Sequence, residues 1–256
     1  MCLIVFAFKE HPDYSIILGA NRDELYERPM RSAQFWKEYP KMLAGRDLSA
    51  GGTWMGVNRR GQWAALTNYR DPSIAKENPP SRGFIVRDFL MQEKGSANFL
   101  ESLQKRAHEY MGFNILAGSP KEIHHYSNQE QKIHTVEPGI HGLSNHLLDT
   151  PWPKVQRSKT NLKKLIESDH ITSEALFDLL LDDRPAPENQ LPNTGIPREQ
   201  EKAVSPIFIK TDRYGTRCST ILLIDKNGNV TFEERRFIPG TMKVEDTNRF
   251  EFAIEH

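Results

Sequence analysis

The feature that most constrains the fold is a pair of uninterrupted apolar runs near the start of the chain, residues 3–8 and 14–20. Neither run alternates with polar residues, and a strand of that kind is covered on both faces. A turn-rich stretch at residues 9–13 separates the runs and predicts an antiparallel hairpin. This hairpin is therefore expected inside a layered fold, with helices or a second sheet on each side.

Polar residues flank this hairpin where its two strands end. Cys2 directly precedes the first run, and Asn21-Arg22-Asp23-Glu24 directly follows the second. Folding about residue 11 would set Cys2 roughly opposite Ala20, with the strands about 4.8 Å apart. Because adjacent strand residues point to opposite faces, one of Arg22 and Asp23 is expected to face away from Cys2.

Removal of Met1 would make Cys2 both a thiol and a free α-amine. The amine titrates at about 7.7–8.0 and a thiol at about 8.5, so the amine can take the thiol proton near neutral pH. Such a cysteine attacks a carbonyl without a histidine. Asp23 would orient the amine, and Arg22 would favour the thiolate or bind a substrate carboxylate. The alternative is that Cys2 merely opens a buried strand.

Composition excludes several classes of protein. The 256 residues include 34 Lys plus Arg and 34 Asp plus Glu, so charge gives no reason to expect nucleic acid or an anionic membrane as partner. The first apolar run is far too short to span a bilayer. With only Cys2 and Cys218, a disulfide framework and a cysteine metal cluster are excluded, and a cytoplasmic location is expected. None of the nine histidines has metal-site spacing.

The rest of the chain predicts two helical blocks among strands. Helices are expected at residues 84–92, 96–110, 154–167 and 173–182, and strands at 113–117, 122–126, 133–136, 207–210, 215–224 and 230–237. Residues 25–40 show no convincing period and are expected to be an irregular loop. No linker is visible. We therefore predict a single domain, residues 1–256, with an α+β fold in which helices cover two stacked antiparallel sheets.

Three further polar residues stand where strands begin or end. Asn68 ends an apolar strand, where its amide would donate to a developing oxyanion, although an isolated asparagine is more typical of a turn. Asn145 lies beyond another strand in the same way. Arg217 begins a strand that is otherwise apolar, and a charge there needs a partner or a site.

Six spaced motifs, covering nearly the whole chain, resemble those of one family. They are Met1-Cys2-Leu3-Ile4, Asn21-Arg22-Asp23-Glu24, Gly51-Gly52-Thr53-Trp54-Met55-Gly56, Leu66-Thr67-Asn68-Tyr69-Arg70, Gly142-Leu143-Ser144-Asn145 and Gly215-Thr216-Arg217-Cys218-Ser219-Thr220. The set resembles the NRDE family, also called the transport and Golgi organisation protein 2 family. That family is similar in turn to the N-terminal nucleophile hydrolases of the penicillin V acylase and bile salt hydrolase group.

The resemblance implies a four-layer αββα sandwich with a catalytic set at one end. The acylases use a terminal cysteine, an arginine and an aspartate, two asparagines and a late arginine. By resemblance, the corresponding catalytic residues of this chain are Cys2, Arg22, Asp23, Asn68, Asn145 and Arg217. The chain departs from the acylases in one respect, since its arginine and aspartate are adjacent.

Two functions follow from these expectations. The first is a cysteine-dependent hydrolase or acyl transferase that acts on an amide or thioester with Cys2 as nucleophile and requires no cofactor. The second is implied by the family's association with haem trafficking and with lipid or acyl-CoA homeostasis. It is a non-catalytic protein that holds haem or acyl-CoA in the same pocket, with Arg22 and Arg217 against carboxylates or phosphates.

If Cys2 is the nucleophile, the protein purified from its native host is expected to lack Met1. The catalytic hypothesis requires a free α-amine on Cys2, because that amine is the only general base it invokes. The intact mass of the protein measures this directly. If Met1 is retained, Cys2 has no free α-amine to act as a base. A mass that includes Met1 would therefore contradict the catalytic hypothesis.

Overall fold

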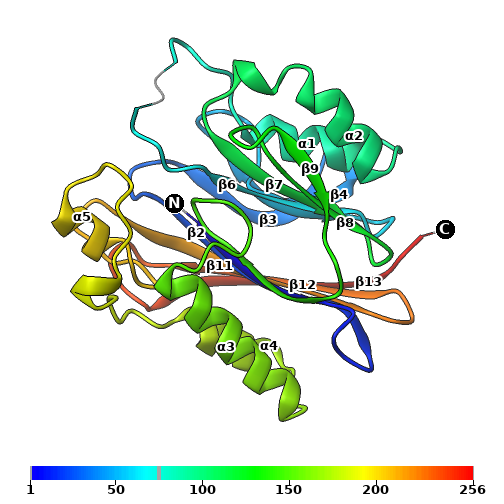
Figure 1. The fold of residues 1–256 in the computed structure, drawn as a ribbon. Coiled ribbons are helices and arrows are strands. Elements are labelled where there is room, and N and C mark those ends of the chain that lie inside the picture. The colour runs from blue at the N-terminus through cyan, green and yellow to red at the C-terminus, as the bar shows by residue number, and fades with distance from the viewer. Residues whose placement is uncertain (1, 74–75, 256) are drawn as a thin grey trace.

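Two antiparallel sheets stack face to face, and helices cover the outer face of each (Figure 1). The computed structural model describes residues 2–73 and 76–255. The six-stranded sheet has the order β10-β1-β2-β11-β12-β13, and the seven-stranded sheet runs from β3 to β9 in chain order. Helices α1 and α2 cover the seven-stranded sheet, and α3 and α4 cover the other. The expected four-layer αββα sandwich is confirmed.

The bounds of the strands are given sheet by sheet, followed by those of the helices. The six-stranded sheet contains β1 (Cys2–Phe8), β2 (Tyr14–Leu25), β10 (Gly139–Leu143), β11 (Tyr214–Asp225), β12 (Asn229–Phe237) and β13 (Val244–Ala253). The other sheet contains β3 (Met30–Trp36), β4 (Tyr39–Asp47), β5 (Met55–Asn58), β6 (Trp63–Asn68), β7 (Phe113–Gly118), β8 (Ile123–Ser127) and β9 (Lys132–Thr135). The α-helices are α1 (Gly83–Met91), α2 (Ser96–Gln104), α3 (Pro153–Glu167), α4 (Ser173–Leu180) and α5 (Arg198–Ala203).

The first apolar run is β1, and it is buried on both faces as predicted. Alternate residues Ile4, Phe6 and Phe8 belong to the core between the two sheets. Leu3, Val5 and Ala7 face the other way and pack in the core beneath α3 and α4. A strand covered on both sides needs no polar alternation, which explains why the run is continuous.

The register of the first hairpin differs from the expected one by two residues. Cys2 pairs with Arg22, whereas Ala20 pairs with Ile4. The reason is the length of the turn, since Phe8 pairs with Ile16 and the chain therefore folds back about residue 12. The correction brings Arg22 directly beside Cys2 instead of beyond it.

Three other expectations are wrong in detail. Residues 25–40 are not an irregular loop, because they contain β3 and the start of β4; irregularities in the pairing of β3 with β4 break the alternation that would have revealed a strand. Residues 207–210 form only an isolated bridge between Lys210 and Gly215. The second helix ends at Gln104, and a 3₁₀ turn at Ala107–Glu109 follows. The Asn128 side-chain amide holds this segment by donating to the carbonyls of Ala107, Tyr110 and Met111.

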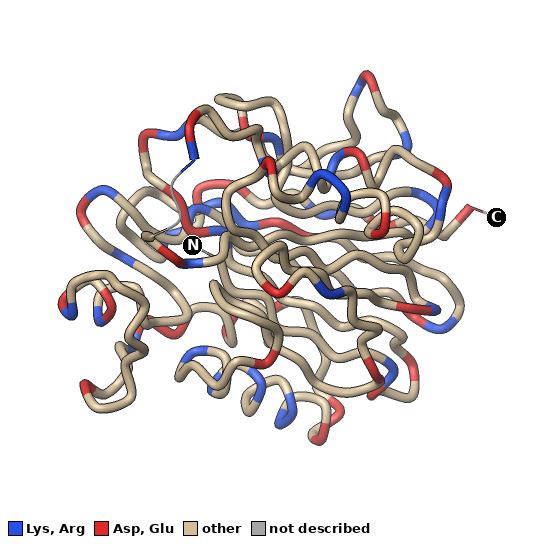
Figure 2. The backbone as a smooth tube through the Cα atoms, turned by 45° about the horizontal axis from the view of Figure 1, so that its top comes forward, with Lys and Arg blue, Asp and Glu red and all other residues tan. Residues whose placement is uncertain are grey.

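Basic and acidic residues are both spread over the described chain (Figure 2). Lys and Arg are interspersed with Asp and Glu over most of the tube, whereas α3 carries Lys154, Arg157, Lys159, Lys163 and Lys164 before its acidic residue Glu167 (Figure 2). Within residues 2–73 and 76–255, no helix is long and apolar enough to cross a membrane.

We predict that Phe6→Ala destabilises the protein by about 3–5 kcal/mol, because it leaves a cavity in the core between the sheets. Phe6 is 0% exposed and packs edge-on against Trp63. Urea unfolding would measure the change. Leu48→Ala is the control, since Leu48 is 45% exposed, and its effect should stay within about 0.5 kcal/mol. Equal effects of the two substitutions would contradict this assignment of the core.

Candidate active site

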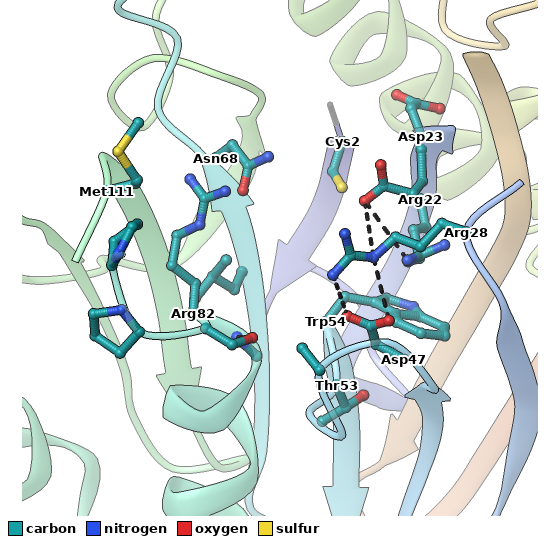
Figure 3. Close-up of a pocket in the computed structure, with 17 residues that line it drawn as sticks. Cys2, Arg22, Asp23, Arg28, Asp47, Thr53, Trp54, Asn68, Arg82 and Met111 are labelled. Atoms are coloured by element: carbon teal, nitrogen blue, oxygen red, sulfur yellow. Dashed lines mark hydrogen bonds and ion pairs between the residues drawn. The ribbon is translucent and has the colours of Figure 1, made fainter. Parts of the chain in front are cut away.

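A cavity of about 360 Å³ opens at the end of the sandwich where β1 begins and β2 and β6 end (Figure 3). Cys2, Arg22 and Asp23 lie on one side, and Asn68, Arg82 and Met111 lie on the other. Among the described residues, the lining consists of Cys2, Arg22, Asp23, Glu24, Arg28, Asp47, Ala50, Thr53, Trp54, Leu66, Asn68, Pro79, Pro80, Ser81, Arg82, Gly83 and Met111.

Cys2 and Arg22 are cross-strand neighbours on the face of the sheet that looks toward the second sheet. The Arg22 guanidinium lies over the Trp54 ring at 4.3 Å from its centroid, and Nη1 lies 3.6 Å from the sulfur of Met30. Ser144 holds the start of β1 in place, because its hydroxyl donates to the Cys2 carbonyl at 3.0 Å. The sulfur therefore sits beside a cation whose orientation is set by an aromatic ring.

Asp23 leaves β2 on the opposite face, as the alternation of a strand requires. Its Oδ1 accepts a hydrogen bond of 2.7 Å from the hydroxyl of Thr216, which pairs with it on the neighbouring strand β11. Asp23 is 2% exposed. It still lines the cavity, because β2 ends at the cavity mouth. Arg22 and Asp23 thus both reach the surroundings of Cys2 from different sides of the sheet.

Arg28 and Asp47 form an ion pair in the same wall. Arg28 donates from Nη2 and Nε to the two carboxylate oxygens of Asp47, at 2.6 and 3.2 Å. This bond raises the pKa of Arg28. Glu24 lies farther away, 3.7 Å from Arg28 and 3.8 Å from Arg22. The Arg28 charge is therefore largely neutralised within the protein.

The two predicted asparagines are connected, but only one of them lines the cavity. Asn68 ends β6 and faces the cavity, opposite Cys2. The Asn145 side-chain amide donates to the Asn68 carbonyl at 2.8 Å, and the Asn145 carbonyl accepts from the Arg70 amide at 2.8 Å. Asn145 consequently lies behind Asn68 and fixes the backbone that presents it.

Arg217 also lies behind the cavity. The pairing of β11 with β2 is irregular between Thr216 and Cys218, and such a bulge re-aims the side chain it contains. The Arg217 Nη1 donates to the carbonyls of Leu25, Tyr26 and Arg28 at 2.8–3.0 Å. These bonds hold the turn after β2, which carries Arg28 into the cavity wall.

Burial dominates the titration of the groups around the sulfur. It raises the pKa of the Cys2 thiol, and the Asp23 carboxylate acts in the same direction, whereas Arg22 lowers it. Burial also raises the pKa of Asp23, against the effect of Lys154. Lys154 is itself 2% exposed, and burial lowers its pKa to about 8 despite the attraction of Asp23. The thiol is therefore protonated at neutral pH unless a nearby base takes its proton.

Two residues, one next to the cavity and one in its wall, have no local sequence signal. Lys154 looks like one of many helical lysines, and Arg82 precedes a helix after a Pro-rich stretch. Their placement follows from contacts between distant segments. The Gly83 carbonyl accepts from the Thr53 amide at 3.1 Å, and a Cβ on Gly52 would lie 2.5 Å from the Gly83 carbonyl carbon. The close approach of the Gly52 backbone to Gly83 thus sets Arg82 at the cavity.

The described residues include no group of three or more His, Cys, Asp or Glu side chains placed to hold a metal ion. None of the histidines in the described part of the chain lines this cavity. The guanidinium groups of Arg22 and Arg82 suit the carboxylates of haem. The described lining residues offer the haem iron no imidazole ligand.

Comparison with known proteins gives a family and a fold. The family model described as Transport and Golgi organisation 2 matches residues 1–239. The Transport and Golgi organization 2 homolog of Mus musculus is 36% identical over 278 residues, and the human homolog is 35% identical over 276, each with 100% of both chains covered. The Drosophila melanogaster protein of that name is 27% identical over 260 residues, with 91% of each chain covered.

Two solved structures share the sandwich. A mutant of conjugated bile acid hydrolase from Clostridium perfringens has a TM-score of 0.57 and 9% identity, covering 98% of this chain and 92% of that one. A Caenorhabditis elegans orthologue of N-acylethanolamine-hydrolyzing acid amidase has a TM-score of 0.50 and 10% identity, covering 87% and 92%. At such identity the likeness shows the fold alone, and it confirms the expected N-terminal-nucleophile-hydrolase-like architecture.

We predict that Lys154→Met moves the alkylation of Cys2 by iodoacetamide to higher pH. Lys154 is a cation whose attraction favours the ionised forms of Cys2 and Asp23, so its removal raises the pKa of both. The rate of alkylation as a function of pH reports the thiolate directly, and Cys218 is 0% exposed. Lys163→Met is the matched control on the exposed side of α3. An unchanged profile in Lys154→Met would show that the lysine does not act on the thiol.

Proposed function

The chain belongs to the transport and Golgi organisation 2 family, and we propose that it is an N-terminal nucleophile hydrolase that cleaves an amide or thioester bond with Cys2 after removal of Met1. One observation carries the proposal. Cys2 opens a central strand at a cavity, with Arg22 directly beside it and Asn68 on the facing wall. The solved relatives are named as hydrolases, but those names describe the relatives, and the proposal for this chain depends on its cavity.

The proposed reaction begins with proton transfer from the Cys2 thiol to its own α-amine, which Asp23 would orient. The sulfur attacks the carbonyl carbon, and the Asn68 amide donates to the resulting oxyanion. The intermediate collapses to a thioester as the ammonium returns the proton to the leaving amine or thiol. Water then attacks the thioester, the amine takes a proton from that water, and the free acid leaves as the thiol is restored.

Arg22 has two uses in this scheme. Its charge lowers the pKa of Cys2, which opposes the effect of burial. Its guanidinium is held against Trp54, so its position changes little when a substrate enters. Arg217 and Asn145 touch neither the sulfur nor the cavity, and in this proposal they position Arg28 and Asn68.

A non-catalytic binding function is the second candidate, and the burial of the Cys2 thiol favours it. Burial raises the pKa of that thiol and leaves it unreactive unless the amine is free. The cavity arginines would then hold the carboxylates or phosphates of a ligand such as acyl-CoA or haem. This function predicts that Cys2→Ala retains ligand binding.

We predict that Cys2→Ala abolishes hydrolysis and that Asn68→Ala lowers kcat by about 10²–10³, the usual cost of one lost oxyanion donor. The measurement is turnover of a panel of amides and thioesters by protein whose mass lacks Met1. Asn98→Ala is the matched control, because Asn98 is exposed on α2, and it should retain full activity. Turnover that survives in Cys2→Ala would refute the nucleophile and leave the binding function.

A further inference from the structure

Three arginines line the cavity, and Arg82 is the one that forms no ion pair among the described residues, although Glu24 attracts it from a distance. Arg82 immediately precedes α1, and its Nη1 donates to the Gly112 carbonyl at 2.8 Å. Among residues 2–73 and 76–255, no carboxylate forms an ion pair with Arg82 within 4 Å. One backbone bond uses a small part of a guanidinium that carries five N–H donors.

The other charges of the cavity are already committed. Arg28 forms its two-point pair with Asp47, Arg22 stacks on Trp54 with Glu24 nearby, and Asp23 is bonded to Thr216. Burial lowers the pKa of Arg82, so the cavity places this cation where its charge is costly. A partly buried cation of this kind is stabilised when an anion enters beside it.

Arg82 also faces the sulfur. It lies with Asn68 on the wall opposite Cys2, and the attraction of a Cys2 thiolate acts on it across the cavity. A substrate carbonyl held between Cys2 and Asn68 therefore has Arg82 beside it. Because the guanidinium fork matches the two oxygens of a carboxylate or a phosphate, it selects among substrates by charge and shape.

We propose that Arg82 is the specificity-determining residue of this site and binds a carboxylate or phosphate oxyanion of the substrate across the cavity from Cys2. The inference rests on the proposed function and names its substrate class, which is an amide or thioester with an anionic group close to the scissile carbonyl. Arg82 takes no part in proton transfer. Its contribution is to hold the substrate so that the carbonyl meets the sulfur.

The first experiment measures binding without turnover. Calorimetric titration of the Cys2→Ser protein with glutarate, inorganic phosphate and neutral glutaramide should give binding of an oxyanion and none of glutaramide; which oxyanion binds identifies its source. Adding Arg82→Gln should weaken that binding about 10- to 100-fold, as expected for the loss of hydrogen bonds to a charged group. Arg87→Gln, one turn farther along α1 and paired with Asp88, is the matched control and should change nothing.

A conservative variant separates charge from geometry and keeps the test valid if Arg82→Gln folds poorly. Arg82→Lys retains the positive charge but not the fork, so it should bind the oxyanion with intermediate affinity. The proposal would be overturned if the Cys2→Ser protein, in which Arg82 is intact, bound glutarate, phosphate and glutaramide equally or bound none of them. So would unchanged oxyanion affinity in Arg82→Gln.

The second experiment measures turnover, and it distinguishes failure of this inference from failure of the proposed function. The probes are the thiophenyl esters of butyrate and of monoanionic succinate. The anionic ester should have the higher kcat/KM, and Arg82→Gln should lower that value about 10- to 100-fold through KM while the neutral ester changes little. Hydrolysis of both esters without a charge preference would overturn the inference and leave the hydrolase. Oxyanion binding that depends on Arg82, without hydrolysis of either ester, would support the anion site and count against the hydrolase.

Discussion

The site depends on the position of β2 between β1 and β11, with hydrogen bonds to both. This pairing sets Arg22 beside Cys2 on one side and beside Cys218 on the other, and it sets Asp23 beside Thr216. The first hairpin brings Cys2 to Arg22, whereas Thr216 and Cys218 lie far along the chain from the β2 residues that they pair with. Because one face of the sheet is buried against the second sheet and the other against helices, a shift of one residue would exchange the two faces and remove the site.

Much of this arrangement follows from the residues themselves. The continuous apolar runs predict a central hairpin, and the position of Cys2 and of the Asn21-Arg22-Asp23-Glu24 segment places a cysteine, a cation and a carboxylate at its open end. The error of two residues in register came from the turn, whose length a five-residue polar stretch does not specify. Asn68 ends β6, as the apolar run before it predicts, and it lines the cavity.

The facing wall could not be predicted in the same way. Arg82 reaches the cavity because α1 begins against Gly52, and nothing in the residues around Arg82 indicates that contact. Lys154 likewise becomes a neighbour of Asp23 only when α3 packs on the sheet, where its ammonium donates to the Val204 carbonyl at 3.1 Å. Hydrophobic periodicity predicts which face of a helix is buried, but it gives no information about a charged residue that is buried with it.

The same sheet geometry separates the two thiols of the chain. Cys2 and Cys218 both lie beside Arg22, on either side of β2, so their Cα atoms are two strand spacings apart, or about 9.6 Å. A disulfide needs Cα atoms within about 7 Å, so the two cannot be joined without moving the central strands. Burial raises the pKa of Cys218 well above its usual range, and the nearby Glu234 acts in the same direction. Arg22 therefore has one sulfur beside it that lines the cavity and one that is fully buried, and the strand that carries Arg22 keeps the two apart.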